Sequence, residues 1–283
     1  MSVYKITNIL VPVDLSESSL NALETAVNVA KKHKASIQIL NVEESNLNTL
    51  EDINAPYFTN SANSSDVLNA LVGAIHHNHG IKPSILNEEG NVADIVIKTS
   101  FLQHADLIVM GAHGASGYRD GFIGSNTYAV IKNAWCPVLS VPSKKQITGY
   151  RNILFPIRPV TGVLTPYQII RLFTNPGTTI EVLGLSNKLV DAGSSVLDTL
   201  LNEIKDELNN DKVKARNSWT SGISIADDIL KYAQETNPDL IVVTPSLDVT
   251  SKPKYIGPHA QKIIHCAKFP VLSIKKANIP SLV

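Results

Sequence analysis

The chain has little of what marks the more specialised classes of protein. Its 283 residues carry 25 basic and 25 acidic side chains, so the formal net charge is zero. No excess of either charge therefore favours nucleic acid or an anionic membrane as a partner. No apolar run approaches the roughly 20 residues needed to cross a bilayer, and the amino terminus shows no signal-peptide pattern. These absences predict a cytoplasmic protein.

Cysteine is also scarce, with Cys136 and Cys266 as its two occurrences, and they do not form a Cys-x-x-Cys pair. We expect both thiols to be reduced and packed beside buried strands, because the cytosol keeps thiols from pairing. A Walker-type Gly-Lys-Ser/Thr sequence is missing as well. Its absence argues against the phosphate loop of the common ATP-hydrolysing enzymes.

What the chain does have is an internal repeat. The sequence Asn-Ile-Leu-Val-Pro-Val-Asp at 8–14 recurs at 152–158 as Asn-Ile-Leu-Phe-Pro-Ile-Arg, at an offset of 144. Asp-Leu-Ile-Val at 106–109 and Pro-Val-Leu-Ser-Val at 137–141 recur near 239 and 270 at an offset of 133. The second copy is therefore 11 residues shorter. We predict two domains, 1–143 and 144–283, joined by the polar segment that begins at Ser143.

Within the first copy, strand and helix patterns alternate. The predicted strands are 6–13, 36–42, 83–87, 106–110 and 138–141. The predicted helices are one that starts after a cap at Ser16, then 67–79, 92–103 and 126–134, and 43–62 is predicted to be a loop or flap. This alternation predicts an α/β fold with a parallel sheet covered by helices on both faces. Ligands of such sheets bind beyond the carboxyl ends of the strands, where Asp14 and Gly111 would share one pocket.

The segment 106–142 is the most informative part of the chain. An apolar run ends at Gly111, Gly114 follows, and Gly124-Ser125 then precedes a helical pattern. Glycines let the backbone approach a ligand, and unpaired N–H groups at a helix N-terminus attract anions. Ser125 adds a hydroxyl at the expected capping position. The pattern predicts a phosphate-binding loop, and the alternative is an ordinary glycine-rich surface loop.

The spacing Gly-x2-Gly-x9-Gly-Ser, with the flanking strands and helix, resembles the nucleotide motif of the ATP-binding universal stress proteins. The resemblance covers nearly the whole chain, with strong motifs in 1–143 and eroded motifs in 144–283. It implies an open, parallel, five-stranded sheet in each copy, of the Rossmann-like type of the adenine nucleotide alpha hydrolases. It also implies ATP, alone or with Mg²⁺, at the strand ends. The two copies would pair through their last strands, Val138–Val141 and 271–274, as an intramolecular pseudo-dimer, and a homodimer is a further option.

The resemblance also assigns roles to single residues. Asp14 would contact the nucleoside part of ATP, since a carboxylate suits ribose hydroxyls or the adenine amino group, although it also fits a helix N-cap. Val42 would offer backbone atoms to the adenine and Met110 would pack against it, but both are equally good core residues. Asn126 would direct its backbone N–H at the phosphates. The full predicted binding set is Pro12, Val13, Asp14, Val42, Met110, Gly111, His113, Gly114, Gly124, Ser125 and Asn126.

No residue is predicted to be catalytic. His113, inside the glycine turn, could act as the general base of an ATPase, but the loop carboxylate Asp120 has no evident reason to face it. We therefore expect His113 to face solvent or to lie near a phosphate. His76, His77 and His79 could supply two ligands to a metal ion, but the sequence offers no clear third ligand. We expect them to end a helix, where imidazolium groups complement its dipole.

The second copy keeps the skeleton of the first without its chemistry. The repeat replaces Asp14 with Arg158, Gly111 with Thr244, Gly114 with Leu247 and Ser125 with Pro258, and it keeps Gly124 as Gly257. Arg158 could bind another anionic ligand, but a structural role for this copy is the simpler interpretation. The resemblance implies a stress-response protein that acts by nucleotide-dependent binding with at most slow hydrolysis. An ATP-consuming enzyme and a ligand-free interaction module are the alternatives.

Overall fold

The computed structural model describes residues 4–44, 61–113, 123–143, 149–158, 166–185, 202, 211–220, 224–248 and 256–275. Its strands are β1 (Asn8–Pro12), β2 (Ser36–Glu43), β3 (Ser84–Glu89), β4 (Leu107–Gly111), β5 (Val138–Val141), β6 (Asn152–Ile157), β7 (Thr179–Leu185), β8 (Lys214–Thr220), β9 (Leu240–Val243) and β10 (Val271–Ser273). Its helices are α1 (Glu17–His33), α2 (Ser61–His79), α3 (Val92–Leu102), α4 (Ser125–Asn133), α5 (Tyr167–Ile170), α7 (Ile225–Thr236) and α8 (Pro258–Cys266), with 3₁₀ turns η1 (Arg171–Phe173) and η2 (Pro245–Asp248).

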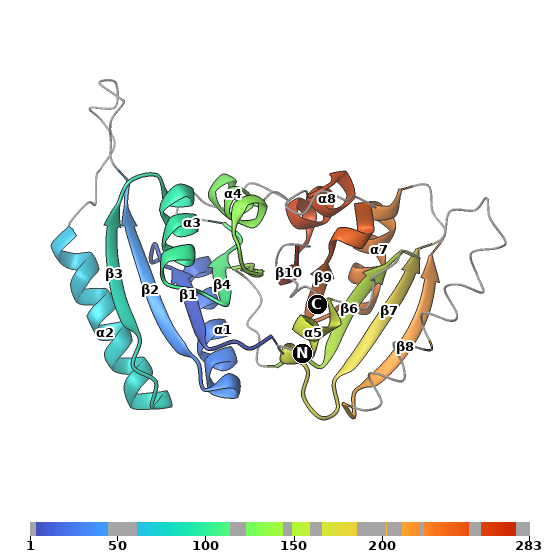
Figure 1. Cartoon of the computed structure of the whole chain (residues 1–283), viewed down its shortest axis with the longest axis horizontal. Coiled ribbons are helices and arrows are strands. Elements are labelled where there is room, and N and C mark those ends of the chain that lie inside the picture. Colours follow the sequence, from blue (N-terminus) through green and yellow to red (C-terminus); the bar gives the residue numbers. More distant parts are fainter. Residues whose placement is uncertain are drawn as a thin grey trace, which may run out of the picture.

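These strands form one ten-stranded sheet in the order β3-β2-β1-β4-β5-β10-β9-β6-β7-β8 (Figure 1). The last five strands have the order of the first five in reverse, so that β8-β7-β6-β9-β10 corresponds to β3-β2-β1-β4-β5. Within each set neighbouring strands run parallel. The two sets meet where β5 and β10 pair antiparallel, with Leu139 opposite Leu272. The predicted α/β fold is confirmed, and its two parallel sheets join into a single mixed sheet.

Helices cover both faces of this sheet, so the central strands are buried on both sides. In β1, Ile9 and Val11 belong to the core beneath α1 and α2, whereas Leu10 belongs to the core beneath α3 and α4. In β6, Ile153 and Leu154 divide in the same way. Each hydrophobic core therefore extends along the sheet through both sets of strands.

The element ends differ from the predicted ones in three informative places. Helix α2 begins at Ser61 rather than at Val67, because its polar first turns lack the apolar period that reveals a helix. Strand β2 runs through Glu43, where the predicted loop was to begin, and the part of that loop at 45–60 lies outside the described residues. Helix α4 begins at Ser125, so Gly124 rather than Ser125 occupies the N-cap position.

Other local predictions hold at the helix ends. Ser16 is the N-cap of α1, and its hydroxyl accepts a hydrogen bond from the Ser19 N–H. Gly80 follows α2 with a φ of 68°, the left-handed conformation that commonly ends a helix.

Cys136 is buried, and its burial raises the thiol pKa to about 12. Within the described part of the chain, no helix is both long and apolar enough to cross a membrane.

Candidate functional site

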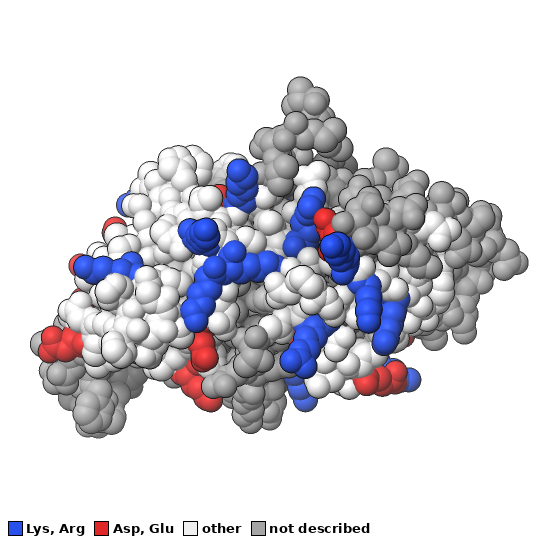
Figure 2. Space-filling view, turned by 90° about the horizontal axis from the view of Figure 1, so that it is seen from below, with Lys and Arg blue, Asp and Glu red and all other residues white. Residues whose placement is uncertain are grey.

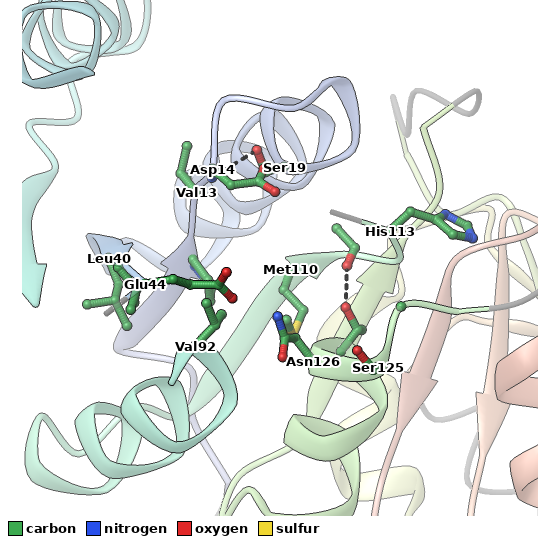
Figure 3. Close-up of a pocket in the computed structure, with 15 residues that line it drawn as sticks. Val13, Asp14, Ser19, Leu40, Glu44, Val92, Met110, His113, Ser125 and Asn126 are labelled. Carbon is green, nitrogen blue, oxygen red and sulfur yellow. Dashed lines mark hydrogen bonds between the residues drawn. The ribbon is translucent and has the colours of Figure 1, made fainter. Parts of the chain in front are cut away.

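A cavity of about 410 Å³ lies beyond the carboxyl ends of β1, β2 and β4, against the start of α4 (Figure 3). Its lining residues are Pro12, Val13, Asp14, Ser19, Leu40, Val42, Glu44, Val92, Met110, Gly111, His113, Gly124, Ser125, Asn126 and Thr127. Every predicted binding residue that the structure describes is in this lining. The remaining one, Gly114, lies outside the described residues. The fold thus brings the predicted residues together, and their role in binding stays a prediction.

Asp14 is held at the end of β1 by a tight turn into α1. Its Oδ1 atom accepts hydrogen bonds from the Ser16 N–H at 3.0 Å and from the Ser16 hydroxyl at 2.5 Å. Leu15, between them, takes a φ of 63°. Asp14 is therefore not the N-cap of α1, which is Ser16, although its carboxylate helps to shape that helix start. The residue is exposed and lines the cavity.

Gly111, at the end of β4, is required by the close passage of α1. A Cβ atom at this position would lie 2.6 Å from the Ser18 hydroxyl oxygen and 3.0 Å from the Ser18 carbonyl carbon. Ser18 cannot easily move away, because its hydroxyl donates to the Val141 carbonyl at 3.0 Å and accepts from the His113 N–H at 3.4 Å. Gly111 does not have a positive φ. Packing is thus a second reason for this glycine, beside the predicted approach of phosphate.

The first turn of α4 is pinned to the end of β4. The Gly124 N–H donates to the Ala112 carbonyl at 2.8 Å, and the buried Thr127 hydroxyl donates to the Gly111 carbonyl at 2.8 Å. The N-cap residue is a glycine and supplies no side-chain cap. The backbone N–H groups of the first turn consequently present partial positive charge at the cavity wall.

The cavity is chemically different at its two sides. Figure 3 shows Leu40, Val92 and Glu44 on one side and Ser125 and Asn126 on the other, with Met110 between them. One side thus offers apolar surface beside a carboxylate, and the other offers hydrogen-bond donors at a helix start. Such a cavity suits an elongated ligand with an apolar group at one end and an anion at the other.

Several lining residues were missed by the sequence reasoning. They are Ser19, Leu40, Glu44, Val92 and Thr127. Leu40 and Thr127 lie two residues from the predicted Val42 and Ser125, so the two-residue period of β2 and the first turn of α4 could have found them. Glu44 and Val92 join the site only because the end of β2 lies beside the start of α3.

The sequence offers His113 as a candidate general base and Asp120 as the carboxylate that would have to face it. The His113 ring points away from Asp14 and Asn126 in Figure 3. Asp120 lies outside the described residues. Across the described ranges, no three His, Cys, Asp or Glu side chains form a group that could hold a metal ion. His76, His77 and His79 are exposed in the last turn of α2.

Comparison with known proteins identifies the family of the chain. The model for the universal stress protein family matches residues 5–142. A universal stress protein of Methanocaldococcus jannaschii is 32% identical over 150 residues, which make up 49% of this chain and 83% of that protein. The chain belongs to the universal stress protein family. Another member, from Synechocystis, is 29% identical over 140 residues, or 47% of this chain and 84% of that protein.

A solved structure shares the fold over almost the full length. The crystal structure of a universal stress protein from Archaeoglobus fulgidus matches with a TM-score of 0.73 and covers 95% of this chain and 98% of that one. The sequence identity is 21%, so the likeness is one of fold. The mixed sheet described above is thus an arrangement that another universal stress protein adopts.

In the second half of this universal stress protein, the side chain of Asp248 lies where the first half has the cavity. The Asp248 carboxylate accepts hydrogen bonds from the His259 N–H at 2.9 Å and from the Ala260 N–H at 3.1 Å. These are the first two N–H groups of α8. A Cβ atom on Gly257 would overlap the Asp248 side chain. The space left here is about 10 Å³. The start of α8 is therefore occupied by a side chain.

The other replaced residues of the second half are also engaged. The Arg158 guanidinium donates to the Leu247 carbonyl at 3.3 Å, and Leu247 is fully buried. Pro258 occupies the first turn of α8 and supplies no N–H. Sequence reasoning found these replacements but missed the capping role of Asp248. Asp248 precedes the first residue of α8 by ten positions, and this spacing matches no capping motif.

Proposed function

We propose that the first half of this universal stress protein binds one ATP molecule, alone or with Mg²⁺. We further propose that it is a cytoplasmic stress-response protein that acts by nucleotide-dependent binding rather than catalysis. The observation that carries the proposal is the start of α4, where no N-cap side chain occupies the N–H groups beside the cavity. The equivalent donors of α8 are occupied by Asp248.

The two sides of the cavity suggest how ATP would lie. The adenine would pack against Leu40, Val92 and Met110, and Asp14 would accept hydrogen bonds from ribose hydroxyls or the adenine amino group. The phosphates would then reach the N–H groups of Ser125 and Asn126. The volume of about 410 Å³ lies within the range of roughly 300–1,000 Å³ typical of small-molecule sites.

In the same proposal, residues 144–283 form a second domain of the family that serves as a structural partner. Its last strand, β10, pairs with β5 of the first domain, which supports an intramolecular pseudo-dimer of the two copies. The pairing covers an edge that would otherwise be open to other chains. With Asp248 at its helix start, this domain is expected to bind no nucleotide.

Calorimetric titration of the full chain with ATP tests the proposal. We expect one site per chain and weaker binding of ADP, which lacks the terminal phosphate. Two equivalent sites would contradict the structural role assigned to the second half. Absence of binding would favour the alternative, a ligand-free interaction module. A product assay on the same samples separates binding from hydrolysis, since rapid turnover would make the protein an enzyme.

A matched pair of variants locates the site. Ser125→Asp places a carboxylate at the start of α4, as Asp248 does at α8, and it should weaken ATP binding by more than about tenfold through charge repulsion. The helix itself should not lose stability, because an acid in the first turn favours the dipole. Ser125→Asn, similar in size but uncharged, is the control. Equal affinities of the two variants would place the phosphates elsewhere.

A further inference from the structure

Three apolar side chains form an exposed cluster where α3 and α4 end. Phe101, Leu102 and Trp135 are 56%, 59% and 48% exposed, which makes them the most exposed large apolar side chains among the described residues. The rings of Phe101 and Trp135 lie against each other, with their centroids 5.7 Å apart. Clustered apolar side chains on a surface mark an interaction site more often than single ones do. We propose that this cluster, the apolar patch, docks the first half onto an anionic lipid surface.

The fold does not require apolar side chains at these positions. The second half repeats the two helices at an offset of 133 residues, because α7 and α8 begin where the repeat places α3 and α4. At the positions equivalent to the apolar patch it carries exposed polar side chains, Gln234, Glu235 and Lys268. The apolar patch is therefore a property of the first half, and the same architecture accepts a polar surface there.

Basic side chains flank the apolar patch. Lys98 lies one turn before Leu102 on α3, and Lys132 lies in the last turn of α4, shortly before Trp135. Both lysines are exposed, as is His104 just beyond α3. An anionic surface that covered the patch would therefore meet ammonium groups at its margin.

The acids near the apolar patch leave this positive charge largely unopposed. The Asp106 carboxylate is engaged at the start of β1, where it accepts hydrogen bonds from the Thr7 N–H and hydroxyl at 2.7 Å and from the Asn8 N–H at 3.0 Å. The exposed Asp94 lies in the first turn of α3, two turns away from Phe101.

The charge of the molecule is unevenly distributed, although its formal sum is zero. Figure 2, a view of the underside of Figure 1, shows Lys and Arg side chains gathered across the middle of the molecule with few acids among them. The amino ends of β2 and β3 point to this side in Figure 1. The end of α3 lies at the same edge of the sheet, because the Asn8 side chain at the start of β1 donates to the Gln103 carbonyl at 2.6 Å. Clustered positive charge attracts an anionic surface.

The composition of the apolar patch fits the interface of a bilayer better than a nucleic acid. Trp is enriched at that interface, and Phe and Leu side chains enter the boundary between headgroups and acyl chains. Lysines can keep their ammonium groups at the headgroups while their stems lie on apolar surface. Single-stranded nucleic acids are held by aromatic stacking, to which the aliphatic Leu102 adds nothing.

Sedimentation of the full chain with vesicles tests the proposal. The vesicles contain phosphatidylcholine alone or mixed equally with phosphatidylglycerol. We expect reversible binding to the anionic vesicles that weakens as salt is added. Phe101→Gln installs the residue type of the second half and should weaken this binding about tenfold, whereas Lys98→Gln should weaken it about fivefold.

Two matched controls accompany these variants. Leu20→Gln changes an exposed apolar residue of α1 outside the apolar patch. Lys231→Gln changes the lysine of α7 that corresponds to Lys98 in the repeat. Both controls should bind as the original chain does, and urea unfolding of each variant verifies that it is folded.

The outcomes distinguish a docking surface from general attraction. Binding to anionic vesicles that responds to Phe101→Gln and Lys98→Gln but not to the two controls supports the proposal. Absence of binding, equal binding to neutral vesicles, or equal weakening by Lys98→Gln and Lys231→Gln would overturn it. Self-association of the full chain without vesicles, if Phe101→Gln abolished it, would assign the apolar patch to a second copy and would also overturn the proposal.

Discussion

Replacing Asp248 with alanine would test whether this carboxylate stabilises the start of α8 in the second half. The change removes the acceptor of two backbone N–H groups, at 2.9 and 3.1 Å. Losing an acidic cap costs about 0.5–2 kcal/mol, and the buried Ala260 N–H would in addition be left without a partner. We therefore expect the free energy of unfolding to fall by about 2 kcal/mol.

Urea unfolding followed by circular dichroism measures this loss. With a slope of about 2 kcal/mol per molar urea, the midpoint should fall by about 1 M. Glu235→Ala removes an exposed acid near the C-terminal end of α7, a different element, and serves as the control, with a change within about 0.5 kcal/mol. Asp248→Asn keeps one acceptor oxygen and should fall between the two. If Asp248→Ala unfolds at the same urea concentration as Glu235→Ala, the hydrogen bonds at α8 do not stabilise the fold and our account of this half is wrong.

Three further predictions concern the first half and its pairing. Ser125→Ala should weaken ATP binding about tenfold, the loss of one hydrogen bond to a charged group, and unchanged affinity in calorimetry would move the phosphates away from Ser125. Gly111→Ala should destabilise the chain by about 1–3 kcal/mol even without nucleotide, because its Cβ would press on Ser18; an unaltered urea midpoint would show that α1 can move aside. Residues 1–145 alone should form dimers in sedimentation analysis, with the exposed β5 edge of one copy pairing with another, and Ser140→Pro should weaken them by removing a strand N–H. A half-chain that stays monomeric at high concentration would refute that pairing.

Local patterns in the sequence determined the α/β class and the position of the site. The alternation of apolar strands and amphipathic helices depends on neighbouring residues, so it is visible without tertiary structure. The same holds for the glycines around Gly111 and Gly124. Parallel strands end at one edge of a sheet, so residues after β1, β2 and β4 had to gather there. For this reason the predicted Asp14, Val42 and Asn126 line one cavity although they are far apart in the chain.

The tertiary structure alone decided the contacts between distant segments. Gly111 packs against Ser18, and Asp248 rather than a cap residue satisfies α8, because the nearest available groups come from other elements. In the same way, Lys32 and His33 of α1 line one cavity with Phe173 of the second half, although these residues are far apart in the chain. Hydrogen-bond partners and packing neighbours are chosen by proximity in space. A periodic pattern specifies each element and its buried face, but it does not specify which side chain of another element meets that face.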